Sequence, residues 1–329
     1  MEDFKKLFNS FTSLKVVVIG DLMLDTYMWG KVDRISPEAP VPVVLIDKKE
    51  YRIGGAGNVA LNCKSLGAQV TVLSILGNDG EGKFLEQLLQ DTGLDTSGLI
   101  KSDKRITTSK TRVISRNQQM MRLDTEITTT ITDDEANALL SKLRAFIAAS
   151  KPDVIIFEDY NKGVLTPALI SEVIALCKAN GIVTAVDPKK KNFFSYKGAD
   201  IFKPNLKEVK EALNLLVDDI GLRQLGSIHG ELEKMLQHRI SFITLSEKGV
   251  FYQQDGDAMI IPSHIRNVAD VSGAGDTVIA VAALVYAATK NVRLMAEVAN
   301  IAGGVVCEEV GTVAISKEKL LQECELLLG

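Results

Sequence analysis

The residues around Asp276 have the types and spacing that most clearly indicate chemistry in this chain. Gly273, Ala274 and Gly275 come directly before this acid, and an uninterrupted apolar run follows it. The run is typical of a buried helix and is too short to cross a membrane. We therefore predict a loop at 273–275, with Asp276 in the first turn of the helix. Unpaired backbone N–H groups and the positive end of the helix dipole would meet at this loop.

An acid beside such a loop has two interpretations. Small residues let an anion approach the backbone amides closely, and a carboxylate would repel that anion. The arrangement makes sense if Asp276 takes a proton from a hydroxyl while the amides stabilise a transferring phosphoryl group. Alternatively, Asp276 only caps the helix, which acids do well. The local pattern favours neither interpretation.

Two glycine-rich motifs together resemble a known family. The stretch Asp270-Val-Ser-Gly-Ala-Gly-Asp276 resembles the second signature of the ribokinase-like (PfkB) carbohydrate kinases, and Gly54-Gly55-Ala-Gly-Asn58 resembles the first. Three further phrases resemble the branch that phosphorylates D-glycero-β-D-manno-heptose 7-phosphate: Gly20-Asp-Leu-Met-Leu-Asp25, Arg34-Ile-Ser-Pro-Glu-Ala-Pro-Val-Pro-Val43, and Ser115-Arg-Asn-Gln-Gln119 leading to Arg122-Leu-Asp124. The similarity covers essentially the whole chain.

The resemblance implies both a fold and a reaction. The fold is a three-layer α/β/α sandwich with a mostly parallel central sheet and a small β lid. The reaction is ATP-dependent phosphorylation of the anomeric C1 hydroxyl of heptose 7-phosphate, a step towards ADP-heptose and the lipopolysaccharide core. There are two alternatives to this function. The chain is another sugar or sugar-phosphate kinase of the same fold, or it is a catalytically silent homologue that only binds sugar. Asp276 argues against silence, because a protein that only binds sugar has no use for a base.

Composition excludes several other classes of function. The formal net charge is −4 and no long basic run is present, so nucleic acid is not the expected partner. The N-terminus has no apolar signal segment, and no membrane partner is expected. The scattered cysteines favour free thiols in a reducing cytoplasm: Cys63, Cys177, Cys307 and Cys324. The histidines show no ligand spacing and are expected on the surface or in loops: His229, His238 and His264.

Strand and helix patterns alternate along most of the chain, which is the mark of parallel α/β units. Strands are predicted at 14–20, 41–46, 70–76, 154–157, 183–186, 201–202 and 242–245, with a hairpin over 249–261. Helices are predicted at 55–67, 132–149, 166–181, 206–215, 277–289, 293–308 and 317–328.

Two segments break this alternation, at about 22–53 and about 105–125. Prolines forbid a helix in the first, and alternating Thr, Val and Ile residues mark the second. We predict that they form the β lid and that its exposed edges pair two subunits into a homodimer. Residues 1–329 are then expected to form one kinase domain, with no nucleotidyltransferase domain.

Ligands of doubly wound sheets bind beyond the carboxyl ends of the strands. That rule gathers the polar residues that follow five predicted strands at one rim: Gly20-Asp21, Glu158-Asp159, Asp187-Pro-Lys189, Asn205 and Ser246. Each one alone is more consistent with a structural role. Together they indicate a binding site.

The resemblance assigns sugar-binding roles to residues near the first signature. Asp25, Gly55 and Asn58 are expected to read sugar hydroxyls, since carboxylates accept and amides both donate and accept hydrogen bonds. Asp21 and Asp159 are assigned to the same site, although Asp21 equally suits a turn.

Four basic residues lie on the predicted lid: Lys110, Arg112, Arg116 and Arg122. A strand places Lys110 and Arg112 on one face, and a substrate that already carries a phosphate needs such a cationic clamp. We expect two of the four to bind that phosphate and take Lys110 and Arg112 as candidates. The alternative is an ordinary solvated charged face.

The resemblance also implies a nucleotide and metal side. Asn205-Leu-Lys-Glu208 matches the family's N-x-x-E, in which Glu208 would position Mg²⁺ through water, and it equally fits a helix capping box. The expected nucleotide contacts are Lys189, Asn205, Glu208, Ser246, Gly249 and Asn300. Asp270, Ser272 and the loop 309–316 resemble a monovalent-cation site suited to K⁺, and capping of backbone amides is the alternative role for Asp270.

Overall fold

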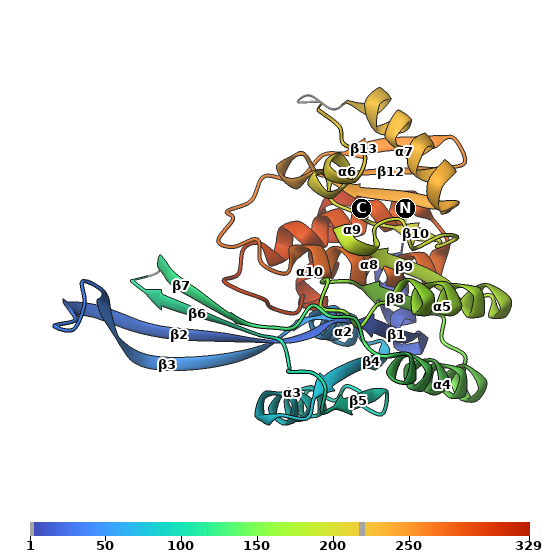
Figure 1. The fold of residues 1–329 in the computed structure, drawn as a ribbon. Helices are drawn as coiled ribbons and strands as arrows, with labels where there is room; N and C mark the ends of the chain where they lie inside the picture. The colour runs from blue at the N-terminus through green and yellow to red at the C-terminus, as the bar shows by residue number, and fades with distance from the viewer. Residues whose placement is uncertain (1–2, 117, 217–220) are drawn as a thin grey trace.

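The computed structural model describes residues 3–116, 118–216 and 221–329, and a nine-stranded sheet runs through its centre (Figure 1). The strand order is β13-β12-β11-β10-β9-β8-β1-β4-β5, and every pair from β11 to β5 is parallel. The strands are β1 (Lys15–Gly20), β4 (Gln69–Gly77), β5 (Leu99–Ser102), β8 (Val154–Glu158), β9 (Val183–Asp187), β10 (Ile201–Phe202), β11 (Ile240–Thr244), β12 (Val250–Gln254) and β13 (Asp257–Ile261). β12 and β13 join as an antiparallel hairpin.

Helices cover both faces of this sheet, because its strands are apolar on both sides. In β1, Val16 and Val18 pack into one hydrophobic core while Val17 and Ile19 pack into the other. The first core is built with α1 (Phe4–Ser10), α2 (Ala56–Ser65), α3 (Gly80–Asp91), α8 (Ala274–Thr289), α9 (Val292–Val306) and α10 (Lys317–Leu328). The second is built with α4 (Asp133–Ser150), α5 (Pro167–Asn180), α6 (Leu206–Ala212) and α7 (Leu222–Leu236). The predicted three-layer α/β/α sandwich is confirmed.

The boundaries of α4 and α5 follow local capping residues in the sequence. Thr132 and Glu135 form a reciprocal capping box at the start of α4. Thr166 caps α5, Pro167 opens it, and Gly181 ends it in the left-handed conformation. These local signals act through neighbouring residues, and the sequence therefore predicts them well.

Three helices escaped prediction, α1, α3 and α7. The apolar residues of α7 recur at helical spacing, but two glycines and many polar residues interrupt the pattern: Leu225, Ile228, Leu232 and Leu236. The histidine prediction was wrong in the same region. His229 on α7 and His238 after it are buried, and their rings lie 2.8 and 2.6 Å from the Ser241 Oγ. Burial lowers the pKa of His238 to about 4, so its ring is neutral near neutral pH.

The second sheet projects from the body as a long curved ribbon (Figure 1). Its order is β3-β2-β6-β7, and we call it the lid: β2 (Leu22–Ile35), β3 (Pro42–Gly55), β6 (Ser109–Ser115) and β7 (Gln118–Thr125). β2 pairs antiparallel with β3 and parallel with β6, so the two segments that break the helix–strand alternation meet in one sheet. β3 is far longer than the strand predicted at 41–46, because its exposed polar half lacks an apolar signal.

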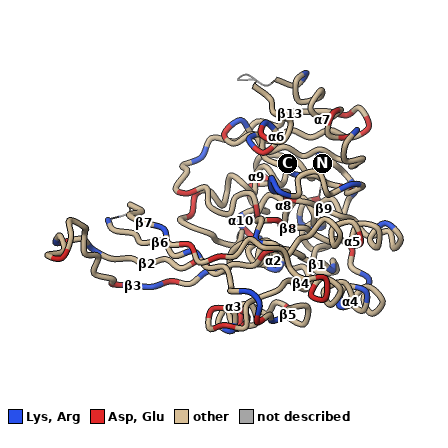
Figure 2. Tube along the Cα trace, viewed as in Figure 1, with Lys and Arg blue, Asp and Glu red and all other residues tan. Residues whose placement is uncertain are grey.

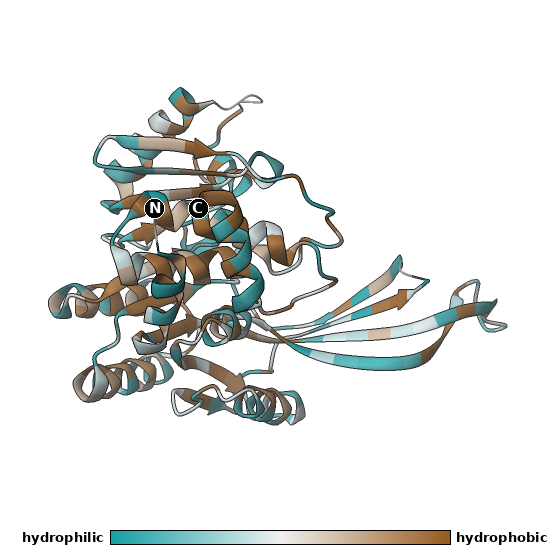
Figure 3. Ribbon diagram, turned by 180° about the vertical axis from the view of Figure 1, so that it is seen from behind, coloured by the Kyte–Doolittle hydropathy of each residue, from teal (hydrophilic) through white to brown (hydrophobic). Residues whose placement is uncertain are grey.

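Charge and hydropathy give two further facts about the surface. Lys and Arg residues are interspersed with Asp and Glu along the trace (Figure 2). Hydrophobic stretches lie on the projecting lid as well as in the body (Figure 3).

No described helix is both long and apolar enough to span a membrane. All four cysteines are free thiols.

Candidate active site

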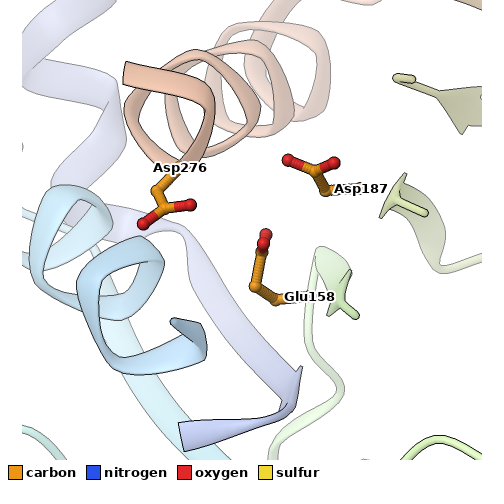
Figure 4. A group of neighbouring side chains, drawn as sticks. All are labelled: Glu158, Asp187 and Asp276. Carbon is orange, nitrogen blue, oxygen red and sulfur yellow. The ribbon is translucent and has the colours of Figure 1, made fainter. Parts of the chain in front are cut away.

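Three adjacent strands of the central sheet end at the same level. Gly20 of β1 is the register partner of Glu158 of β8, and Glu158 is the partner of Asp187 of β9. Asp276 reaches the same place from the first turn of α8, so that three buried carboxylates point toward one another (Figure 4). One oxygen of each lies within 4.8 Å of the others. The site therefore forms where the rule for open α/β sheets places it.

The start of α8 differs in detail from the prediction. Gly273 is the N-cap, and Ala274 and Gly275 already belong to the helix instead of preceding it as a loop. Gly273 has a φ of 79°, and a Cβ there would lie 2.7 Å from the Asn58 Nδ2. Both facts require glycine at this position. No side chain caps the helix, although the Ala274 amide donates to the Val271 carbonyl at 3.3 Å. The start of α8 can therefore still receive an anion.

Asp276 does not cap α8. Its two carboxylate oxygens accept hydrogen bonds from the Asn58 Nδ2 at 2.7 Å and from the Tyr160 hydroxyl at 2.8 Å. Burial raises the pKa of Asp276 to about 6, even though these two hydrogen bonds lower it. A carboxylate with this pKa is ionised at neutral pH and can accept a proton from a hydroxyl. The capping interpretation is wrong, and the geometry suits a general base.

Two lysines compensate Asp187. The Lys203 Nζ lies 2.7 Å from one oxygen of Asp187, and the Lys189 Nζ lies 3.5 Å from the other. Burial raises the pKa of Asp187, but the two lysines outweigh burial and hold that pKa below its usual value. Lys189 also pairs with Glu208 at 2.7 Å, and its own pKa is raised despite burial. Two fixed cations thus stand beside the three carboxylates.

The N-x-x-E segment forms the capping box that the sequence also allowed. The Asn205 side chain accepts from the Glu208 amide, and Glu208 accepts from the Asn205 amide, both at 2.8 Å. Since Glu208 also binds Lys189, its oxygens are already engaged, which suits a contact with Mg²⁺ through water. The carboxylates of Glu208 and Asp187 offer the oxygen donors that Mg²⁺ prefers. The residues therefore fit this metal.

The root of the lid carries the expected sugar-binding residues. Asp25 on β2 pairs with Arg112 on β6 at 2.5 Å. Gly54 lets this carboxylate approach, since a Cβ there would lie 2.3 Å from its Oδ2. Gly55 begins α2 as its N-cap, and Asn58 follows in the first turn. Asp25 therefore lies beside Gly54 at the end of β3, and the turn at Gly55 leads to Asn58, which reaches Asp276.

Asp21 and Asp159 hold the loop that carries Tyr160. Asp21 accepts from the backbone amides of Tyr160, Lys162 and Val164, at 2.8, 3.0 and 3.1 Å. Asp159 accepts from the side chains of Asn192 and Tyr196, at 3.0 and 2.8 Å. These contacts support the turn-forming alternative for Asp21. A direct sugar contact by either acid stays a prediction.

The basic lid residues are partly committed to other groups. Arg112 is bound to Asp25, and Arg122 forms a two-pronged pair with Asp124 at 2.8 and 2.9 Å. Lys110 is half-buried, and burial together with nearby Lys162 lowers its pKa. A lysine beside another lysine is a favourable partner for a phosphate.

The remaining predicted residues have structural contacts. Asp270 accepts from the Ser272 amide at 3.0 Å and from the Gly311 amide at 2.9 Å, as the capping alternative required. Gly249 and Asn300 meet at Pro262, whose carbonyl accepts from the Asn300 Nδ2 at 2.8 Å, while Ser246 begins the turn that Gly249 ends. Their roles toward a cation or adenosine stay predictions.

Several residues at the site were not assigned roles in advance. Glu158 and Tyr160 follow the strand predicted at 154–157. The rule that ligands bind beyond the carboxyl ends of parallel strands indicated this segment but not which of its side chains turn inward. Lys203 directly follows the strand predicted at 201–202, which is β10, but nothing in the sequence indicated that its side chain turns inward. Arg52 of β3 donates to the backbone carbonyls of Val310 and Thr312, at 2.6 and 3.3 Å, which joins the lid to the loop after α9.

The fold and this site are those of sugar kinases. A family model described as pfkB family carbohydrate kinase matches residues 13–319, and the chain belongs to this family. It is accordingly an ATP-dependent carbohydrate kinase.

Curated relatives narrow the comparison. The chain is 39% identical over 322 residues to the "Bifunctional protein HldE" of Geobacter sulfurreducens, covering 97% of this chain and 65% of that protein. It is 40% identical over 311 residues to the protein of the same name from Sulfurimonas denitrificans, covering 94% and 64%. The chain thus spans slightly less than two thirds of the length of these relatives.

Solved structures confirm the ribokinase-like fold. Phosphofructokinase-2 from Escherichia coli in complex with potassium superposes with a TM-score of 0.80 at 16% identity, covering 96% of this chain and 99% of that one. Ribokinase from Arabidopsis thaliana, complexed with ribose and ATP, gives a TM-score of 0.73 at 16% identity, covering 94% and 99%.

Proposed function

We propose that this chain, as one kinase domain, transfers the γ-phosphoryl group of ATP to the C1 hydroxyl of D-glycero-D-manno-heptose 7-phosphate. The observation that carries the reaction type is Asp276, a buried carboxylate with a pKa of about 6 at the start of α8. The heptose assignment is supported by the phrases at 20–25 and 34–43 and by the relatives named HldE. The product, heptose 1,7-bisphosphate, would enter ADP-heptose and lipopolysaccharide core synthesis.

In this mechanism the sugar lies at the root of the lid. Asp25 and Asn58 orient its hydroxyls, and Asp276 accepts the proton of the C1 hydroxyl as that oxygen attacks phosphorus. Tyr160 and Asn58 hold the Asp276 carboxylate in place through their hydrogen bonds. The backbone amides of Gly273, Ala274 and Gly275 stabilise the charge on the transferring group. Glu208 would hold Mg²⁺ through water beside the ATP phosphates, where that ion would supply charge neutralisation.

The 7-phosphate would be held on the lid. Lys110 lies near Lys162, and Lys110 and Arg112 are two residues apart on β6 and so share one face of the strand. These cations would distinguish a phosphorylated from a free sugar through charge-assisted hydrogen bonds.

A coupled assay of ADP release against a panel of acceptors tests this proposal. We expect heptose 7-phosphate to have the highest kcat/KM, well above free heptose, fructose 6-phosphate and ribose. A higher value for fructose 6-phosphate or ribose would overturn the heptose assignment while leaving the kinase assignment intact. Absence of ADP release with every acceptor would favour the silent homologue.

We also infer a homodimer formed through the lid. The strands project from the body (Figure 3). Several large apolar side chains on them and on the turn between β2 and β3 are solvent-exposed in one chain: Ile35, Val41, Leu45, Ile46, Met120, Met121 and Leu123. Exposed apolar surface on an edge-bearing sheet is costly unless a partner covers it.

The setting of the reaction is proposed on chemical grounds. The cytoplasm supplies ATP and keeps the four thiols reduced. K⁺ at Asp270, Ser272 and the loop 309–316 stays part of the proposal, and replacing K⁺ by Na⁺ in the ADP-release assay would test it.

A further inference from the structure

A cavity of about 310 Å³ lies at the amino ends of the parallel strands, opposite to the three carboxylates. The starts of β9, β10 and β11 and the ends of α5 and α8 surround it, and its polar lining residues are Lys178, Thr184, Asp200, Arg239, Tyr286 and Lys290. Its size is within the range of small-molecule sites. None of the residues assigned to the reaction lines it, so the proposed kinase activity does not account for it.

Three basic side chains and one acidic side chain line this cavity. None of Lys178, Arg239 and Lys290 forms an ion pair with a described residue. The acid is Asp200, and one of its oxygens accepts from the Thr184 amide at 2.8 Å and from the Thr184 hydroxyl at 3.0 Å. Positive charge is therefore in excess among the lining residues, and an anion would find unpaired cations there.

Tyr286 adds a hydrogen-bonding group to the same cavity. The residue is only 1% exposed, and its hydroxyl makes no hydrogen bond with any described residue. Burial raises the pKa of this hydroxyl while Arg239 lowers it, so the hydroxyl lies near Arg239. The Lys290 ammonium lies 5.2 Å from the centre of the ring. A buried hydroxyl without a partner is unfavourable unless another molecule forms a hydrogen bond with it.

Helix ends explain only part of this arrangement. Lys178 lies in the last turn of α5 and Lys290 is the C-cap of α8, where a cation interacts favourably with the helix dipole. Asp153, which also acts on Lys290, lies outside the cavity lining. Arg239 belongs to no helix, and the Tyr286 hydroxyl carries no charge. These two groups point to a ligand that is negatively charged and accepts hydrogen bonds.

We propose that this cavity binds a small phosphomonoester through its three basic side chains and the Tyr286 hydroxyl. A phosphomonoester dianion offers three acceptor oxygens, which suit charge-assisted hydrogen bonds from lysine and arginine. β9 places Thr184 at this cavity and Asp187 at the reacting end, about 10 Å apart along the strand. A ligand in the cavity therefore does not reach the reacting groups, and the site is one for an effector and not for a substrate.

Isothermal titration calorimetry with glycerol 3-phosphate, at constant ionic strength and without ATP, metal or heptose, tests the site directly. We expect the wild-type chain to bind this probe and Arg239→Gln to bind it at least tenfold more weakly. Arg144→Gln, which alters an exposed arginine on α4, should bind as the wild type does. Lys110→Ala should also keep this binding, which separates the cavity from the lid, and glycerol without phosphate should not bind. No binding by the wild type, or equal binding by wild type and Arg239→Gln, overturns the proposal.

Thermal unfolding supplies a second readout that also reports folding. Without ligand, Tyr286→Phe should melt at or above the wild-type temperature, because it removes a buried hydroxyl that has no partner in the chain. Glycerol 3-phosphate should raise the Tm of the wild type and of Arg144→Gln, and it should raise the Tm of Tyr286→Phe and Arg239→Gln less. A lower Tm for ligand-free Tyr286→Phe, or equal ligand-induced rises in all four proteins, would contradict the proposal. Both measurements omit ATP and heptose, so they decide this site even if the proposed heptose reaction proves wrong.

Discussion

The carboxylates Glu158, Asp187 and Asp276 in the body differ from the lid in how firmly contacts within the chain hold the side chains in place. In the body, Asp276 is buried and held by two hydrogen bonds from side chains of the same chain. On the lid, β7 is exposed along its whole length, and Arg112 occupies the carboxylate of Asp25 that a sugar would use. The body is thus pre-organised for proton transfer. The proposed substrate and second subunit would contact lid surfaces that are exposed or paired within this chain.

The largest expected effect lies in the body. Asp276→Asn should reduce kcat by about 10³-fold, because the amide cannot accept the hydroxyl proton. Its shape is preserved, so sugar binding and Tm should be close to those of the wild type. Stopped-time assays of ADP release and calorimetric sugar binding provide the two measurements. Near-normal turnover would show that another group is the base.

The second prediction concerns the lid and compares the roles of Lys110 and Arg112 in binding the substrate. Lys110→Ala should raise the KM for heptose 7-phosphate about 10–100-fold while changing the KM for ATP little, because a charge-assisted contact to phosphate is lost. Arg112→Ala should also raise the KM for heptose 7-phosphate, and it should weaken binding of free heptose as well, because the buried Asp25 carboxylate loses the partner that holds it in place.

The matched control for this pair is Arg122→Ala, whose guanidinium pairs with Asp124 on β7. It should leave both KM values close to those of the wild type. Equal effects of Lys110→Ala on sugar phosphate and ATP would remove the lid clamp from the mechanism.

The third prediction tests whether the lid needs a partner. Leu45→Glu on β3 and Met121→Glu on β7 place charges on exposed apolar positions. We expect monomers by light scattering and a kcat/KM reduced several-fold, with little change in Tm because neither side chain is part of the core. Lys101→Glu on the central-sheet edge strand β5 is the control that should keep the oligomeric state. Unchanged mass for both lid variants would contradict the homodimer.

The body and the lid also differ in how much of each could be predicted from the sequence. The strand ends near Gly20, Glu158 and Asp187 were predictable, because buried β-branched runs and the rule for parallel sheets locate them. Which side chains turn inward was not predictable, because that depends on register between strands far apart in sequence. Asp276 and Tyr160 are separated by more than a hundred residues, and nothing local to either indicates their 2.8 Å hydrogen bond.

In the lid, the strand segments could be predicted but the contacts between them could not. Its alternating segments were recognisable, yet the salt bridge of Arg112 with Asp25 depends on a parallel pairing of β2 and β6. Lys110 and Arg112 therefore looked equivalent in sequence while their surroundings differ. The capping box of Asn205 and Glu208 was predictable because it involves only four consecutive residues.

The smallest expected effect concerns the hydroxyl of Tyr160, which donates to Asp276. This hydrogen bond stabilises the ionised carboxylate, so Tyr160→Phe should raise the pKa of Asp276 above its value of about 6. A base must be unprotonated to act, and the rate should therefore fall as pH drops through that pKa. In Tyr160→Phe the fall should begin at higher pH, by about half a unit to one unit. Above pH 8 the variant should recover to within a few-fold of wild-type kcat.

The substitution isolates the hydroxyl, because phenylalanine keeps the ring that lies 5.5 Å from the Lys189 ammonium. Tyr51→Phe on the exposed face of β3 is the matched control and should leave the pH profile of kcat unchanged. A profile for Tyr160→Phe that is lowered equally at every pH would mean that the hydroxyl positions the site without tuning its base. A shift of the acid limb alone would show that the body sets the proton affinity of Asp276 through a residue that never reaches the lid.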